Sequence, residues 1–118
     1  MIQINIRSRH EAKPDDELGR RYCGWSEGLS PDEVYEAARG CWKLSDRANS
    51  EKFAVVVHRS LVRCVIEIDR IEPVSTGLRA IVGRPVAQGH PLHERWTGQP
   101  APSIRGGGSI TYVDESPS

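Results

Sequence analysis

The chain has 118 residues, of which 37% are hydrophobic and 27% are charged, and its formal net charge at pH 7 is zero. A chain of this length buries roughly two-thirds of its unfolded surface, so we predict a single domain over residues 1–118. No apolar run reaches transmembrane length and no secretory signal begins at Met1, so we expect a soluble cytoplasmic protein that does not enter a membrane. The neutral charge balance also disfavours tight nonspecific binding to long DNA, which depends on neutralising many phosphates.

The basic residues are uneven in kind, because thirteen of the sixteen are arginine and three are lysine. Guanidinium groups favour planar, bidentate recognition of anions where they cluster. The codon bias of a GC-rich genome would give the same excess. The arginine content is therefore compatible with anion binding, but it does not indicate where in the chain an anion would bind.

The three cysteines, Cys23, Cys41 and Cys64, are odd in number and show no CxxC spacing. This pattern argues against a disulfide framework and against a zinc ribbon. Cys41 follows the end of a predicted helix, where the helix dipole disfavours a thiolate. We expect all three to be reduced, mostly buried thiols, and the sequence predicts no cofactor.

The chain begins with an alternating pattern and continues with a charged segment. Ile2, Ile4 and Ile6 alternate with polar residues, which predicts a half-buried strand over residues 1–7. Residues 8–21 are rich in charge and poor in apolar anchors, which predicts an exposed polar loop or arm.

A helix is predicted over Pro31–Arg39. Ser30 is a good N-cap, proline stands at the first helical position, and Glu33 can complete a capping box with Ser30. Gly40 is placed to end the helix in a left-handed conformation. Residues 45–50 predict a second, shorter helical turn.

Residues 53–58 and 61–71 are rich in valine and isoleucine and are separated by Arg59-Ser60, which predicts a β-hairpin. We expect one face of its second strand to pack on the core and the other to look outward. The first face comprises Val62, Cys64, Ile66 and Ile68, and the second comprises Arg63, Val65, Glu67 and Asp69.

Two further strands are predicted over residues 78–83 and 109–113, and residues 114–118 are expected to form a disordered tail. Short sequential strands with one capped helix predict a small α+β fold or a partly open β-barrel.

The order of these elements resembles a known superfamily. The relevant stretches are residues 38–44 (ARGCWKL), 53–57 (FAVVV), 62–68 (VRCVIEI) and, more weakly, 105–113 (RGGGSITYV). Together they are similar to small bacterial domains of the PUA-like superfamily, to which ASCH and EVE domains belong. The resemblance implies a small, partly open β-barrel with one capped helix packed against it. It also implies a pocket between helix and barrel mouth that takes a base or nucleotide, often a modified one.

Trp42 is the main candidate for contact with such a ligand. A tryptophan after a helix-terminating glycine can provide a flat face for an unstacked base, and packing in the core is the equal alternative. Arg39 and Lys43 flank it and can contact phosphate, although a basic residue in a last helical turn also complements the helix dipole. Trp25 is a second stacking candidate for which core packing is the simpler interpretation.

Arg105 is the second candidate for phosphate binding, together with the glycines at 106–108. Consecutive backbone amides, such as that of Gly107, can form an anion-binding nest beside a guanidinium group. A connection to the last strand is the simpler interpretation of this glycine run.

Metal binding and catalysis find weaker support. His90, His93 and Glu94 lie close together, but a proline between the histidines and the absence of a fourth ligand argue against a zinc site. Some ASCH-type relatives combine a lysine and a glutamate for hydrolysis, and Lys43 and Glu67 are the counterparts here. A solvated charged face explains Glu67 more simply. The sequence therefore leaves enzymatic activity uncertain, and it favours a protein that is not an enzyme.

The sequence therefore predicts a binding module for a plain or modified nucleic-acid base or nucleotide. The first alternative is a small phage- or defence-related interaction protein that captures a nucleotide or inhibits a partner. The second is a weak ASCH-like hydrolase acting on RNA or nucleosides. A homodimer or a protein partner stays open.

Overall fold

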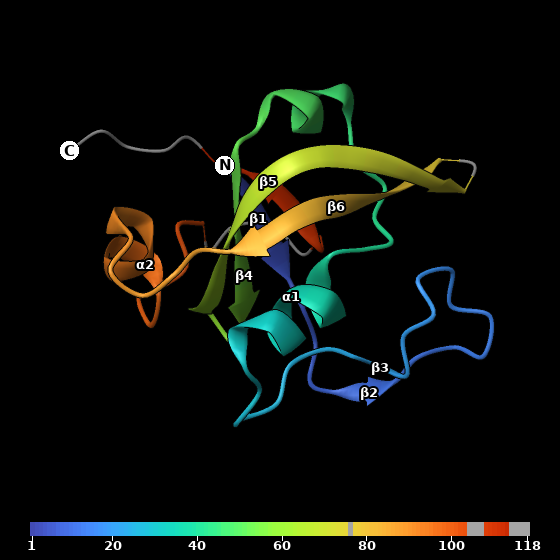
Figure 1. Ribbon diagram of the computed structural model, residues 1–118, viewed down its shortest axis with the longest axis horizontal. Coiled ribbons are helices and arrows are strands. Elements are labelled where there is room, and N and C mark those ends of the chain that lie inside the picture. The colour runs from blue at the N-terminus through green and yellow to red at the C-terminus, as the bar shows by residue number, and fades with distance from the viewer. Residues whose placement is uncertain (76, 104–107, 114–118) are drawn as a thin grey trace.

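The centre of the fold is a five-stranded sheet with the strand order β6-β5-β4-β1-β7 (Figure 1). The computed structural model describes residues 1–75, 77–103 and 108–113. The sheet comprises β1 (Ile2–Asn5), β4 (Phe53–His58), β5 (Leu61–Ser75), β6 (Leu78–Pro85) and β7 (Ile110–Tyr112). A separate two-stranded sheet is formed by β2 (His10–Glu11) and β3 (Tyr22–Cys23). The helical elements are α1 (Pro31–Ala38), the 3₁₀ helix η1 (Asp46–Ser50) and α2 (Pro91–Trp96).

The predicted α+β class is confirmed. β1 pairs in parallel with β4, and the other neighbouring strands of the large sheet are antiparallel. The pairing ends at β6 on one side and at β7 on the other. Over the described residues, the sheet is therefore open and is not closed into a barrel.

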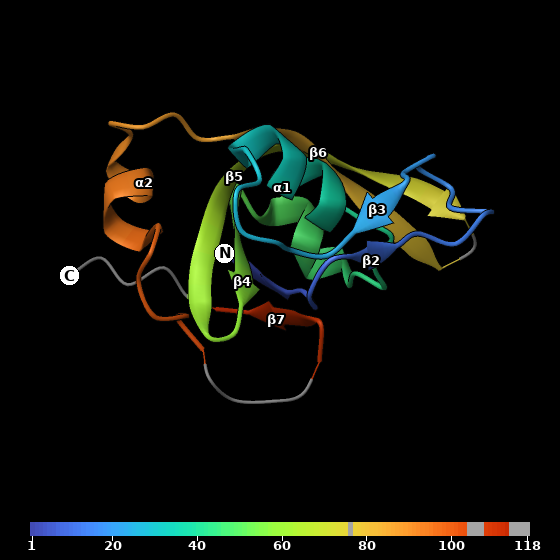
Figure 2. The ribbon, with the colours of Figure 1, turned by 90° about the horizontal axis from the view of Figure 1, so that it is seen from below.

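The predicted hairpin between β4 and β5 is confirmed, including its two-residue turn. Arg59 (φ 50°) and Ser60 (φ 66°) both adopt left-handed conformations. Such turns match the right-handed twist of the flanking strands. β5 continues to Ser75, beyond the predicted end at residue 71, because it pairs along its length with β6. Figure 2 shows this two-stranded ribbon extending past the centre of the sheet.

One predicted strand face is wrong at Val62. Val56 pairs with Cys64, whereas the next residue of β4, Val57, pairs with Val62, so Arg63 is an extra residue in β5. Such a bulge reverses which side chains share a face. Val62 accordingly joins the cluster on the opposite side of the sheet from Cys64.

Both faces of the central strands are covered. On one face α1 and η1 bury a cluster that includes Ile4 and Ile66, and on the other α2 packs over a cluster that includes Val55 and Val65. The predicted outward face of β5 is therefore wrong at Val65, which is 1% exposed. Gln3 is also buried, although its alternation in β1 predicts an outward position. Its side-chain amide is satisfied by the backbone of the segment before β7.

α1 forms as predicted, with the capping box complete. The Glu33 backbone donates to Ser30 Oγ at 3.2 Å, and the Ser30 backbone donates to Glu33 Oε1 at 3.1 Å. The prediction for Gly40 is wrong, because this glycine has no positive φ. A Cβ at Gly40 would lie 3.0 Å from the Cβ of Ala80, so glycine is needed there for close contact with β6.

The outer edge of β6 is covered by α1 and by the residues that follow it. Tyr35 Oη accepts a hydrogen bond from the Gly83 backbone at 2.9 Å and donates one to the Ile81 carbonyl at 3.3 Å. Trp42 pairs with Arg79 through two backbone hydrogen bonds of 2.9 Å. These contacts satisfy backbone groups that would otherwise be free to pair with another strand.

Within the described ranges, no helix has both the length and the apolar character needed to cross a membrane.

Candidate functional site

A cleft of about 650 Å³ lies between the β2–β3 hairpin and the turn that follows α1. It is lined by the end of β1 and the residues after it, and by Leu78 of β6. Gly40, Cys41 and Trp42 line one wall. The opposite wall is built by hairpin residues that include His10, Glu11, Lys13, Asp15 and Glu17.

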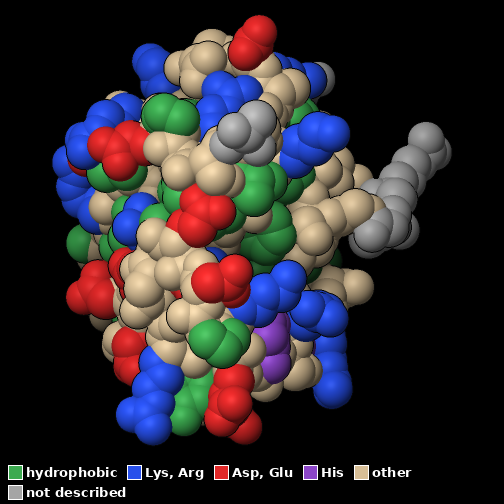
Figure 3. All heavy atoms as spheres, turned by 90° about the vertical axis from the view of Figure 1, so that its right-hand side faces the viewer, with side chains coloured by type: hydrophobic (Ala, Val, Ile, Leu, Met, Phe, Trp, Pro, Cys, Tyr) green, Lys and Arg blue, Asp and Glu red, His purple; other side chains and the backbone are tan. Residues whose placement is uncertain are grey.

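The charge of this cleft is mixed. Four carboxylates line it, those of Glu11, Asp15, Asp16 and Glu17, against the three permanent cations of Arg7, Lys13 and Arg20. Figure 3 likewise shows acidic and basic side chains intermingled on the face of the molecule that carries the hairpin. The cleft therefore presents hydrogen-bond acceptors as well as donors and is not a basic channel.

A partly buried ion pair, between Arg20 and Asp16, fixes the hairpin to α1. The Arg20 guanidinium binds both carboxylate oxygens of Asp16, with its closest contact at 2.8 Å. The same group donates to the carbonyl oxygens of Ala37 at 3.2 Å and Gly40 at 2.6 Å, which completes the end of the helix. The hydrogen bond from the Arg20 side chain lowers the pKa of Asp16. Residues 8–21, predicted as a polar loop or arm, thus contain β2 and are docked on the domain.

Trp42 both packs on the core and lines the cleft. Its indole nitrogen donates to the Ala38 carbonyl at 2.7 Å, and its ring lies against the core cluster beneath α1. Trp42 as a whole is half-buried, and it is one of the residues that line the cleft. The two interpretations of Trp42 left open by the sequence, core residue and ligand contact, are therefore compatible.

The structure does not bring Arg39 and Lys43 into the cleft beside Trp42. The Arg39 guanidinium donates to the Ile81 carbonyl at 3.2 Å and to Glu36 at 3.3 Å, at the edge of β6. Lys43 is exposed and does not line the cleft.

Trp25 lies in a second aromatic group, outside the cleft. Its ring stacks on His58 with centroids 4.9 Å apart, and the Arg63 guanidinium carbon lies 4.1 Å from its centroid. His58 is 6% exposed, and its Nε2 lies 3.2 Å from Ser8 Oγ. Burial, reinforced by Arg63 and Arg59, lowers the pKa of His58.

The two residues suggested for hydrolysis lie apart. Glu67 pairs with Arg84 at 2.9 Å, and Lys43 follows Trp42, which pairs with Arg79. Residues 79 and 84 are five positions apart on β6, which corresponds to about 17 Å along a strand. No described contact joins Lys43 to Glu67.

His90 caps the start of α2 and accepts a hydrogen bond from the Leu92 backbone at 3.1 Å. His93 lies within α2, 3.7 Å from Glu94. Over the described ranges, no three His, Cys, Asp or Glu side chains form a group that could hold a metal ion.

Of the three cysteines, Cys64 is buried as predicted, and burial raises its pKa to about 12. Cys23 and Cys41 are half-buried and both line the cleft. Arg105 and Gly107, the other predicted phosphate contacts, lie outside the described residues, as does the predicted tail at 114–118.

Sequence reasoning missed the hairpin wall of the cleft. His10 and Lys13 belong to a charged segment without periodicity, and only the contact of that segment with α1 and the turn after it brings these residues to the cleft. Arg20 belongs to the same charged segment, and its guanidinium group binds Asp16 and two backbone carbonyls.

Comparison of the chain with protein-family models, curated proteins and solved structures found no match.

Proposed function

We propose that this chain is a PUA-like binding module for a nucleic-acid base or nucleotide, and that the base binds in the cleft against Trp42. The observation that carries the proposal is a half-buried tryptophan on the wall of a cleft with mixed donors and acceptors. The cleft volume of about 650 Å³ falls within the range of small-molecule sites.

The chemistry of the two walls supports a base more than a phosphate group. The indole N–H of Trp42 is already bonded to Ala38, so the ring offers an apolar surface for stacking. On the opposite wall, Glu11, Asp15 and Glu17 can accept hydrogen bonds from exocyclic amines or ribose hydroxyls. The excess of carboxylates over permanent cations disfavours a phosphate inside the cleft.

Calorimetric titration with plain and base-modified nucleosides and their monophosphates tests this proposal. Leu78 lines the cleft, so Leu78→Arg should block it and reduce affinity at least about tenfold. Leu61, which is 38% exposed and does not line the cleft, provides the matched control Leu61→Arg. Circular dichroism checks that both variants are folded.

Failure of every nucleoside and nucleotide to bind the wild-type protein would contradict the proposal and favour the interaction protein. If Leu78→Arg and Leu61→Arg reduce the affinity equally, the cleft is not the binding site. Release of a free base from a nucleoside during the titration would instead support the hydrolase.

A further inference from the structure

Two arginines flank an exposed tyrosine on the outer side of the β2–β3 hairpin. The guanidinium carbon of Arg9 lies 4.1 Å from the Tyr22 ring centroid, and that of Arg21 lies 5.5 Å from it. Both distances are within the range of cation–π contact. Tyr22 is one of two large hydrophobic residues exposed on the described surface. We call Arg9, Arg21 and Tyr22 the arginine–tyrosine cluster.

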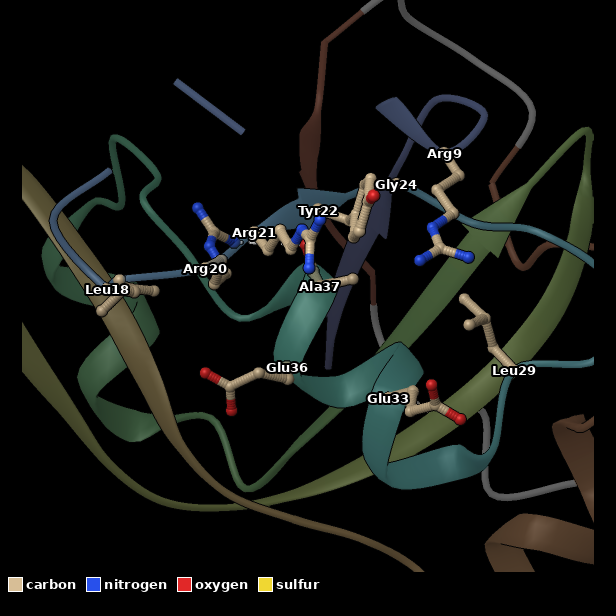
Figure 4. A pocket seen from close by; sticks show the side chains of 11 residues that line it. Arg9, Leu18, Arg20, Arg21, Tyr22, Gly24, Leu29, Glu33, Glu36 and Ala37 are labelled. Carbon is tan, nitrogen blue, oxygen red and sulfur yellow. Dashed lines mark hydrogen bonds between the residues drawn. The ribbon is translucent and has the colours of Figure 1, made fainter. Parts of the chain in front are cut away.

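The cluster borders a second hollow, of about 260 Å³, between the hairpin and α1. Figure 4 shows the Arg9 guanidinium reaching from the hairpin side toward Leu29 and Glu33 on the helix side. Leu18 and Leu29 provide apolar walls, and Ala37 lies between them on α1. The hollow thus combines an exposed ring, apolar walls and two cationic groups.

The two cations of the cluster are available to an anion. Within residues 1–75, 77–103 and 108–113, the guanidinium groups of Arg9 and Arg21 make no hydrogen bond or ion pair. Two carboxylates also line the hollow: Glu33 accepts the Ser30 backbone N–H at 3.1 Å, and Glu36 pairs with Arg39 at 3.3 Å. The Ser30 hydrogen bond, and to a lesser degree Arg9, lowers the pKa of Glu33.

The small hollow and the cleft adjoin each other. Arg20, Gly24 and Ala37 line both, so the two hollows meet where the hairpin joins α1. They differ in charge, because four carboxylates and three permanent cations line the cleft, whereas three arginines and two carboxylates, those of Glu33 and Glu36, line the small hollow. A ligand that spans both would place its neutral part in the cleft and its anionic part at the cluster.

We propose that the ligand is a single-stranded oligonucleotide, with one base in the cleft and the adjoining phosphodiester bound by Arg9 and Arg21. This inference rests on the proposed function of the cleft. Single strands are bound by aromatic side chains together with cationic ones, and Tyr22 supplies the aromatic part of this cluster by holding the two guanidinium groups against its ring. Guanidinium groups suit this role, since they bind phosphate oxygens in a bidentate manner.

Fluorescence anisotropy with labelled single-stranded RNA and DNA hexamers, over a range of salt concentrations, tests the inference. The double variant Arg9→Gln/Arg21→Gln should lose about tenfold or more in hexamer affinity. The slope of log affinity against log salt should fall by about 0.7, as expected when one phosphate of a single strand is no longer neutralised. Its affinity for the free nucleoside should not change.

The matched control is Arg70→Gln/Arg84→Gln, which removes two exposed arginines from the β5–β6 ribbon. Equal effects of the two double variants on hexamer affinity and salt slope would overturn the inference, whatever happens at the cleft. If Arg9→Gln/Arg21→Gln weakens hexamer binding and Leu78→Arg does not, the phosphate contact stands and the base site fails.

Discussion

The indole nitrogen of Trp42 donates a hydrogen bond to the carbonyl oxygen of Ala38 at 2.7 Å, across the C-terminal turn of α1. Helices end with carbonyl groups that lack intrahelical donors, and here a side chain four residues later supplies one. The bond fixes the indole between the core and the cleft.

The first prediction concerns this bond. Trp42→Phe keeps an aromatic ring but leaves the Ala38 carbonyl without its donor, so the free energy of unfolding should fall by about 1–3 kcal/mol. Urea denaturation followed by circular dichroism measures the change. An unchanged free energy of unfolding would show that the bond contributes no net stability.

The second prediction concerns the tether between the hairpin and α1. Asp16→Asn leaves the Arg20 guanidinium, whose side chain is 6% exposed, without its counter-charge. Loss of one partner from a buried pair costs about 3–5 kcal/mol when both groups are fully buried, and Asp16 is 12% exposed, so we expect the lower end.

The loss should appear first as local opening of the hairpin. Amide hydrogen exchange of Ala12, which donates to the Arg21 carbonyl, reports this opening directly. We expect faster exchange at Ala12 in the variant, with little change in the β4–β5 pair. Equal acceleration in both places would indicate global rather than local destabilisation.

The third prediction concerns His58. Because burial and the charges of Arg63 and Arg59 lower its pKa below the ordinary value of 6.5, the unfolded chain binds more protons than the folded one near that pH. Stability from this group is therefore present above about pH 6.5 and declines as the pH falls below it.

An NMR titration of the His58 ring should give a midpoint below 6.5, and Arg59→Gln should raise it. The melting temperature of His58→Phe should also depend less on pH between 7 and 5 than that of the wild-type protein. A His58 midpoint at or above 6.5 would contradict the assignment.

The fourth prediction concerns thiol reactivity. The pKa of Cys64 is about 12, so almost no thiolate exists at pH 8, and its side chain is also inaccessible. Burial raises the pKa of Cys23 and Cys41 as well, but both are half-exposed at the cleft. Iodoacetamide at pH 8 should modify Cys23 and Cys41 slowly and leave Cys64 unmodified, as read by mass spectrometry. Alkylation of Cys64 at a rate equal to the others would refute this.

The parts of the fold that the sequence predicted are those encoded locally. The capping box of Ser30 and Glu33 spans four residues, and the Arg59-Ser60 turn joins two adjacent β-rich runs. Each signal lies within one element and its immediate flank. The helix α1 and the β4–β5 hairpin were therefore recoverable from the sequence alone.

The features that the sequence did not predict depend on contacts between distant segments. The sequence predicts a left-handed conformation at Gly40. Glycine is needed there for another reason, because a Cβ would lie too close to Ala80 of β6. The predicted face of Val62 is wrong because the bulge at Arg63 leaves no clear signal in the neighbouring sequence. Trp42 is a ligand-contact candidate from the sequence because it follows the predicted helix. The hairpin side of the cleft is not predicted, because it forms only where the Arg20 guanidinium binds the Gly40 carbonyl and holds the hairpin in place.

The central claim is that a nucleic-acid base binds in the cleft against Trp42. The indole N–H signals of Trp25, Trp42 and Trp96 in ¹H–¹⁵N NMR spectra, recorded during titration with a nucleoside, test it without any mutation. We predict a saturable shift of the Trp42 signal, with the signals of Trp25 and Trp96 nearly unchanged. A Trp42 signal that stays in place at saturating nucleoside, or a shift confined to Trp25 or Trp96, would contradict the claim.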